Sequence, residues 1–179
     1  YQNEQGISPQ FNKHLESVAN LVEEHIGKDQ IVEIGCGKGF FLEFLSNKGF
    51  NIRGYDTTYE GSNAQIEKRY VETSDKLNVK GIILRHVLEH ILNPLEFLKL
   101  LQKVAGSRGL IYIEVPCFDW TVKHRAWYDI FYEHVNYFRL NDFKKIFGKI
   151  VDSGHLFNGQ YIYVIADLSS IRDPKFRAE

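Results

Sequence analysis

Hydrophobic positions recur along the chain with two different spacings, which predict helices and buried strands in alternation. Residues 8–26 carry apolar side chains three or four positions apart behind a Ser-Pro start, as expected of an amphipathic helix. Further helices are predicted at residues 40–49, which end in a glycine, and at residues 94–105 and 140–147. Short apolar runs predict strands at residues 30–34, 51–56, 80–91 (strand-like over 82–84), 109–116, 149–157 and 160–168.

The polar segment at residues 57–78 is less regular, and we expect it to hold a short helix and an edge strand. Strands that alternate with helices imply an α/β fold, a parallel sheet with helices on both faces. The last two apolar runs leave little room for a helix between them, which predicts an antiparallel member at one edge of the sheet. Ligands of such sheets bind at the carboxyl ends of the strands.

Composition narrows the class of protein further. The 179 residues, 44% of them hydrophobic, fit one domain over residues 1–179, and the lack of any methionine indicates a fragment or core piece. The 22 basic and 23 acidic residues nearly cancel, and no basic run exists to bind nucleic acid. Two cysteines, Cys36 and Cys117, are too few for a disulfide framework, which favours a cytoplasmic location. No apolar run approaches the roughly 18 residues of a membrane span.

Three glycines at alternate positions, Gly35, Gly37 and Gly39, follow the first predicted strand. Glycines let the backbone turn sharply and approach a ligand closely. A dinucleotide fingerprint requires G-x-G-x-x-G, and Phe40 occupies its last position here, which argues against NAD or FAD. Asp56 ends the second strand, where an acid can hydrogen-bond a ribose. Together these features predict an adenosine-type ligand without a pyrophosphate.

This pattern resembles the class I methyltransferases that depend on S-adenosyl-L-methionine (SAM). Their acid-G-x-G-x-G motif is matched by Glu33 and the three glycines, and their second acid by Asp56. The stretches RHVLEHILNPLEFL and GLIYIEVP are similar to the family's fourth-strand and fifth-strand regions. The resemblance implies a Rossmann-like, doubly wound seven-stranded sheet, mostly parallel with the last strand antiparallel. It also implies SAM as cofactor and S-adenosyl-L-homocysteine (SAH) as product.

By the same resemblance, the glycine loop holds the methionine part of SAM and Asp56 holds its ribose. Cys36 is accommodated as a small residue between the glycines, and a reactive thiol is not expected there. We place two further residues, Arg85 and His86, at the end of the fourth strand beside SAM. The expected cofactor-binding residues are therefore Glu33, Gly35, Cys36, Gly37, Gly39, Asp56, Arg85 and His86.

The stretch HVLEH, residues 86–90, matches the inverted zinc-protease signature H-x-x-E-H. On a helix, His86 and His90 would bind zinc and Glu89 would act as the base. The strand-like run before His86 and the Asn-Pro pair after the motif leave only a single turn between them. A zinc hydrolase therefore remains the less favoured alternative, and we predict no metal site.

The aromatic stretch YDIFYEHVNYF, residues 128–138, contains a Glu-His pair suited to proton transfer. Packing in the core is the competing interpretation. The stretch resembles the Y-x-E-H-x-x-Y-F motif of sugar C-methyltransferases, although Phe131 stands where their catalytic tyrosine falls. We expect His134 to act as base, Glu133 to orient it and Tyr137 to line the acceptor pocket.

These patterns predict an enzyme that transfers a methyl group to a small-molecule substrate. A sugar or nucleotide-linked sugar of polysaccharide or natural-product biosynthesis is the expected acceptor. Methylation of carbon, oxygen and nitrogen all remain open, as does a non-catalytic SAM-binding domain. The oligomeric state is undetermined.

Overall fold

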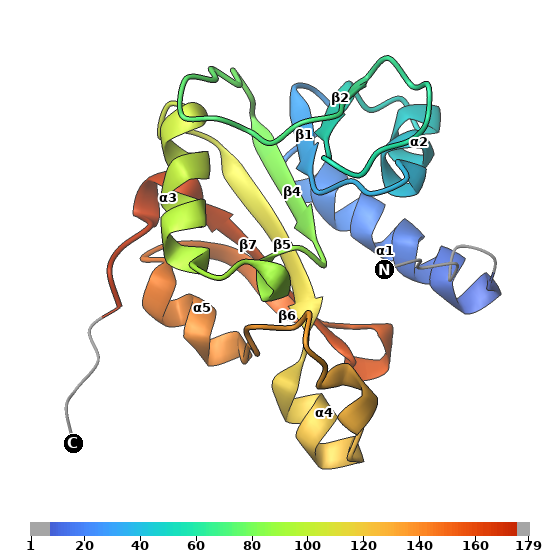
Figure 1. The fold of residues 1–179 in the computed structure, drawn as a ribbon, viewed down its shortest axis with the longest axis vertical. Coiled ribbons are helices and arrows are strands. Elements are labelled where there is room, and N and C mark those ends of the chain that lie inside the picture. Colours follow the sequence, from blue (N-terminus) through green and yellow to red (C-terminus); the bar gives the residue numbers. More distant parts are fainter. Residues whose placement is uncertain (1–7, 175–179) are drawn as a thin grey trace.

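A single seven-stranded sheet organises the computed structural model, which describes residues 8–174 (Figure 1). The strand order is β3-β2-β1-β4-β5-β7-β6. Strands β1 to β5 pair in parallel, and β7 runs antiparallel to both β5 and β6. The predicted doubly wound sheet with an antiparallel last strand is confirmed. The strands are β1 (Ile31–Ile34), β2 (Ile52–Tyr55), β3 (Ile66–Glu67), β4 (Gly81–Arg85), β5 (Leu110–Pro116), β6 (Ile150–Leu156) and β7 (Tyr161–Asp167).

Helices cover both faces of the sheet and bury two apolar clusters against it. One cluster packs α1 (Pro9–His25) and α2 (Phe40–Asn47) on the sheet, and the other packs α3 (Pro94–Val104) and α5 (Leu140–Ile146) on the opposite face. Figure 1 shows these two pairs on opposite sides of the central strands. Because both faces of β1 are covered, all four of its residues are buried, the charged Glu33 included.

Local signals placed the first helices correctly. The Ser8 hydroxyl accepts a hydrogen bond from the Phe11 N–H at 3.0 Å and caps α1, whose Val18 and Val22 are fully buried. Gly49 follows α2 with a φ of +83°, the left-handed conformation that ends many helices. Between residues 57 and 80 the edge strand β3 forms, but the short helix we expected there does not.

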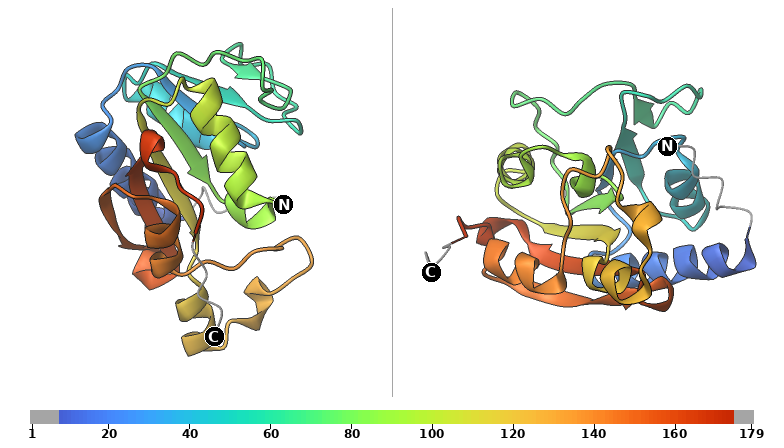
Figure 2. Two further views of the ribbon diagram at one scale, coloured as in Figure 1. Left: turned by 90° about the vertical axis from the view of Figure 1, so that its left-hand side faces the viewer. Right: turned by 60° about the horizontal axis from the view of Figure 1, so that its bottom comes forward.

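A small lobe follows β5 and projects beyond the carboxyl end of that strand (Figures 1 and 2). It contains α4 (Phe118–His124), a 3-10 turn at Trp127–Asp129 and the chain that leads back to α5. The apolar run at residues 80–91 becomes β4 and a second 3-10 turn, Leu88–His90. None of the helices in residues 8–174 is long and apolar enough to cross a membrane.

Candidate functional site

The loop after β1 lies where the parallel strands β1, β2 and β4 end together. All three of its glycines have left-handed backbone angles, with a φ of +72° at Gly35, +56° at Gly37 and +82° at Gly39, the residue that precedes α2. A Cβ on Gly35 would lie 2.4 Å from Val87 Cγ2, so the loop packs tightly against the turn that follows β4. A Cβ on Gly37 would meet no atom within 4 Å. The loop thus has one face against the protein and another beside open space.

Two acids lie at this loop. The Asp56 carboxylate accepts a hydrogen bond from the Gly37 N–H at 2.7 Å, so the acid at the end of β2 braces the glycine turn. Glu33 is 3% exposed, and its Oε2 atom has no hydrogen-bond partner among the described residues. Burial raises the pKa of the Glu33 carboxyl to about 7, against the opposing effect of the Arg85 guanidinium.

Burial also raises the pKa of the Cys36 thiol, and the negative charge of Glu33 adds to this effect. A reactive Cys36 thiolate is therefore disfavoured, as expected.

A fully buried carboxylate, Glu114 of β5, gathers the charged groups at the adjoining strand end. Its Oε1 atom accepts hydrogen bonds from Arg85 Nη2 and from His14 Nε2, each at 3.1 Å. The Nε2 atom of His86 lies 3.0 Å from the same oxygen, at ion-pair distance. The Tyr112 hydroxyl donates to Oε2 at 2.8 Å. Arg85 and His86 therefore both point toward Glu114, from the strand end where we placed them.

Sequence reasoning missed Glu114 and His14. A glutamate inside the apolar run of residues 110–116 was a visible signal, because a charge in a strand buried on both faces needs a partner. The partner itself was not visible, since His14 lies 100 positions earlier in the chain. Burial alone would raise the pKa of Glu114, but the Arg85 charge and the two histidines outweigh it and hold that pKa well below its usual range.

The charge on His86 makes the stability of the ligand-free protein depend on pH. Burial would lower the pKa of His86, but the carboxylates of Glu114 and Glu89 raise it to about 9 from an unfolded value of 6.5. Between these values the folded state binds more protons than the unfolded state, so the free energy of unfolding falls as pH rises. We expect His86 to contribute about 1–3 kcal/mol below pH 6.5 that is lost by about pH 9.

Urea unfolding of the wild type and of His86→Gln at pH 6 and pH 9.5 measures this contribution. The variant is expected to lose less stability than the wild type over that interval. Equal losses in the two proteins would contradict the assignment.

His134 lies on the part of the lobe that leads to α5, here called the His134 loop (residues 130–139), and backbone contacts join this loop to the turn after β4. The Glu89 carbonyl accepts hydrogen bonds from the Val135 and Asn136 N–H groups at 3.0 and 3.1 Å. The Asn136 side chain donates to the Ile91 carbonyl at 2.6 Å. These contacts hold the buried His134 beside the strand ends, with its ring 4.9 Å from that of His90.

The contacts of His134 differ from our expectation in one respect. Its Nδ1 atom lies 2.9 Å from the carbonyl oxygen of Asp129, not against the Glu133 carboxylate. That carboxylate instead accepts a hydrogen bond from the Tyr132 hydroxyl at 2.8 Å, on the exposed side of the loop. Tyr137 is exposed, and its ring centroid lies 6.4 Å from that of His134. A backbone carbonyl rather than Glu133 therefore orients the histidine.

The zinc-protease arrangement of H-x-x-E-H does not form. The signature requires a helix that presents His86 and His90 on one face, whereas only Leu88–His90 are helical, as one 3-10 turn. His86 has a φ of +53° and is turned toward Glu114, while His90 lies next to His134. The less favoured zinc-hydrolase alternative is therefore wrong in the form we considered.

Comparisons with known proteins agree with the fold. A family model described as a methyltransferase domain matches residues 10–150. A ubiquinone biosynthesis O-methyltransferase from Rickettsia akari is 27% identical over 114 residues, which cover 55% of this chain and 45% of that protein. The chain therefore spans less than half the length of this curated relative.

Solved structures show the same architecture. The PH0226 protein of Pyrococcus horikoshii superposes with a TM-score of 0.66 and 14% identity, over 94% of this chain and 93% of that one. A structure of the complex between the Haloferax volcanii Trm112 methyltransferase activator and its partner superposes with a TM-score of 0.66 and 10% identity, over 95% of this chain and 93% of that one. The 1,6-didemethyltoxoflavin-N1-methyltransferase of Burkholderia thailandensis was solved with bound 1,6-didemethyltoxoflavin and SAH. It superposes with a TM-score of 0.64 and 12% identity, over 88% of this chain and 80% of that one.

The sheet order, the glycine loop and the matched family model define a class I SAM-dependent methyltransferase fold. The chain belongs to the methyltransferase domain family, and its cofactor is SAM. The resemblance to the sugar C-methyltransferases in particular is not confirmed by these comparisons.

The residues at the glycine loop fit this cofactor. SAM carries a positive sulfonium and a positive ammonium group, and the Asp56 carboxylate supplies negative charge at the same loop. The unpartnered Glu33 carboxyl, with its pKa of about 7, would ionise more readily beside such a positive ligand. The space beside Gly37 leaves room for the ligand against the backbone.

Proposed function

We propose that this protein transfers the methyl group of SAM to a hydroxyl group of a small metabolite, with His134 as the proton acceptor. The observation that carries the proposal is the hydrogen-bonded contact between the His134 loop and the turn after β4. The same turn packs against the glycine loop through Val87 and Gly35. One continuous set of contacts therefore links the loop that receives the cofactor to the histidine on the acceptor side.

On the donor side, the glycine loop would hold the methionine part of SAM, with Glu33 near its positive groups and Asp56 near the ribose. Arg85 and His86 would border the cofactor from the end of β4. SAM supplies an electrophilic methyl group on a sulfonium, so most of the acceleration comes from holding the acceptor oxygen in line with it. The proposed cofactor-binding residues are Glu33, Gly35, Cys36, Gly37, Gly39, Asp56, Arg85 and His86.

On the acceptor side, the state of His134 suits a base. If Nδ1–H donates to the Asp129 carbonyl, the lone pair is on Nε2. Burial lowers the pKa of His134, although the Glu89 charge opposes this, so the ring is neutral at pH 7 and able to accept a proton. Tyr137 would line the acceptor pocket, and Glu133 would steady the loop through its bond to Tyr132.

Two acceptor classes are favoured by different observations. The match of Glu133, His134, Tyr137 and Phe138 to the sugar methyltransferase motif favours a sugar or nucleotide-linked sugar. The similarity to a ubiquinone biosynthesis O-methyltransferase favours oxygen as the methylated atom and adds phenolic quinone precursors as candidates. We retain the sugar as the first choice and the phenol as the second.

Replacement of His134 tests the proposal. His134→Gln is expected to lower the rate of methyl transfer about 10²- to 10⁴-fold, because the base is lost, while SAH still binds. Transfer of labelled methyl from SAM to nucleotide sugars and to phenolic quinone precursors measures the rate, and calorimetry with SAH measures binding. The exposed His124→Gln is the control variant. Full activity of His134→Gln would refute the base, and SAH binding without transfer to any acceptor would favour a non-catalytic SAM-binding domain.

A further inference from the structure

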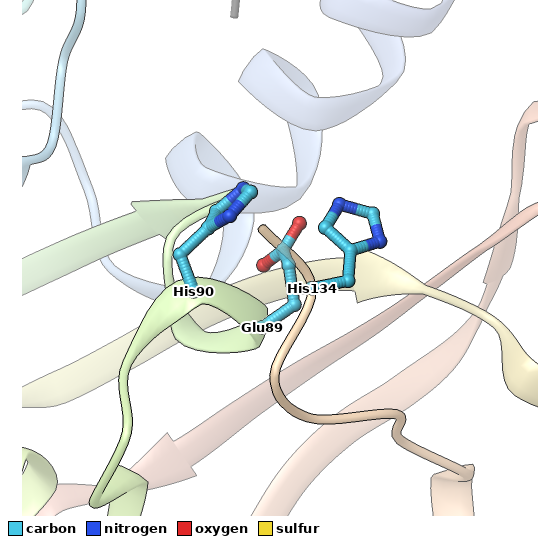
Figure 3. A group of neighbouring side chains, drawn as sticks. All are labelled: Glu89, His90 and His134. Atoms are coloured by element: carbon cyan, nitrogen blue, oxygen red, sulfur yellow. The ribbon is translucent and has the colours of Figure 1, made fainter. Parts of the chain in front are cut away.

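Three potential metal ligands converge between the turn after β4 and the His134 loop. Glu89 and His90 come from the 3-10 turn and His134 from the loop 44 positions further along the chain, and one ligand atom from each lies within 4.8 Å of the other two. Figure 3 shows the Glu89 carboxylate between the two imidazole rings, with all three side chains on the same side of their backbones.

Both imidazole rings are held in the orientation that metal-binding histidines require. The Nδ1 atom of His90 lies 2.9 Å from the Glu133 carbonyl oxygen, and the Nδ1 atom of His134 lies 2.9 Å from the Asp129 carbonyl oxygen. A carbonyl oxygen only accepts, so each Nδ1 carries the proton and each Nε2 carries the lone pair. A backbone carbonyl on the far nitrogen is the common way in which proteins fix the tautomer of a metal ligand.

The Glu89 carboxylate is the second observation that points to a cation. Glu89 is 1% exposed, and neither of its carboxylate oxygens accepts a hydrogen bond from the described residues. The His86 ring lies at ion-pair distance, 3.5 Å from Oε1. A buried carboxylate without hydrogen bonds is costly, and coordination of a cation is one of the few arrangements that removes this cost.

We propose that Glu89, His90 and His134 bind one divalent cation of the zinc class. Two imidazole nitrogens and one carboxylate suit Zn²⁺, whereas Ca²⁺ and Mg²⁺ prefer oxygen ligands alone. Zinc bonds of about 2.1 Å in tetrahedral geometry place the ligand atoms about 3.4 Å apart. The ligand atoms of the three side chains lie within 4.8 Å of one another, so they would approach one another by up to about 1.4 Å on the ion. Three protein ligands leave a fourth position open to water or to an acceptor oxygen.

The surrounding backbone prepares the site. The Glu89 carbonyl already accepts bonds from Val135 and Asn136, and Asn136 also reaches the Ile91 carbonyl. Because these contacts join the two segments without an ion, little of the binding free energy is spent on ordering them. The cation would link the lobe to the end of β4.

This ligand set differs from that of the H-x-x-E-H signature, which uses His86 and His90. In the structure the Nε2 atom of His86 lies 3.0 Å from Glu114, and the place of the second histidine is taken by His134. The variants His86→Gln and His134→Gln therefore separate the two sets.

The inference goes beyond the proposed methyl transfer and shares only His134 with it. While Nε2 ligates the ion it cannot accept a proton, and an oxygen bound at the open position then loses its proton more readily. Cation binding is measured without SAM or acceptor, so a negative result would leave the proposed methyl transfer intact.

Calorimetric titration of the tag-free, chelator-treated protein with Zn²⁺ tests the site. We expect one Zn²⁺ per chain in the wild type and a loss of affinity of at least about 100-fold in His134→Gln and in Glu89→Gln. His86→Gln should bind at least as tightly as the wild type, because it removes the positive charge that lies 3.5 Å from the Glu89 carboxylate. The exposed His155→Gln in β6 is the matched control. Circular dichroism establishes that each variant is folded.

A second measurement does not depend on the variants. Saturating Zn²⁺ should raise the unfolding temperature of the wild type, and Mg²⁺ at the same concentration should not. Absence of binding in the wild type, equal binding by His134→Gln, or loss of binding in His86→Gln but not in His134→Gln would each overturn the proposal.

Discussion

Gly37→Ala is expected to lose most of its affinity for SAH while it remains folded. A Cβ at this position points into space free of protein atoms beside the glycine loop. If the ligand occupies that space, the methyl group displaces it from the backbone, at about 2–3 kcal/mol, which corresponds to about 30- to 150-fold in the dissociation constant. Calorimetry with SAH measures the change.

Gly49→Ala provides a matched control for this experiment. Gly49 also has a positive φ, +83°, and a Cβ there also meets nothing within 4 Å. Both substitutions impose backbone strain of about 1–2 kcal/mol, so both variants should lose similar stability in urea. Only Gly37→Ala should lose affinity for SAH. Equal affinities in the two variants would show that the ligand does not lie against Gly37.

Glu114→Ala is expected to be the most destabilising single substitution among those considered. It removes the common partner of the Arg85 and His86 side chains and of His14, all of which stay buried or largely buried. Loss of one partner from a buried charge network costs about 3–5 kcal/mol, because the remaining charges have no compensation. Urea unfolding at pH 7 measures the difference from the wild type.

Two further variants separate charge from shape in this network. Glu114→Gln keeps the size of the side chain and removes its charge, so it should also be clearly destabilised, although less than the alanine variant. Glu96→Ala breaks an exposed ion pair with Lys99 and should change stability little. If Glu114→Ala were as stable as the wild type, Glu114 would not be the carboxylate that compensates the buried charges of Arg85 and His86.

The outcomes at the polar positions show why local patterns were insufficient there. Adjacency in the sequence predicts that Glu133 and His134 act as a unit, yet their side chains have different partners, Tyr132 and the Asp129 carbonyl. The H-x-x-E-H spacing brings histidines together only on a helix, and the chain at His86 instead has a positive φ. The spacing of residues in a motif therefore predicts contacts between their side chains only where the chain adopts the secondary structure that the motif requires.

The sequence by itself determined the sheet, most of the helices and the glycine turn after β1, because apolar periodicity, caps and glycines act over a few neighbouring residues. Only the tertiary structure decided the partners of the buried charges. It brought His14 to Glu114, which is 100 positions away in the sequence. It also brought His134 to Glu89 and His90, which lie about 45 positions earlier in the sequence. Such pairs depend on which strand ends and loops meet in space, and the desolvation that forces buried polar groups to pair acts only once the sheet has formed.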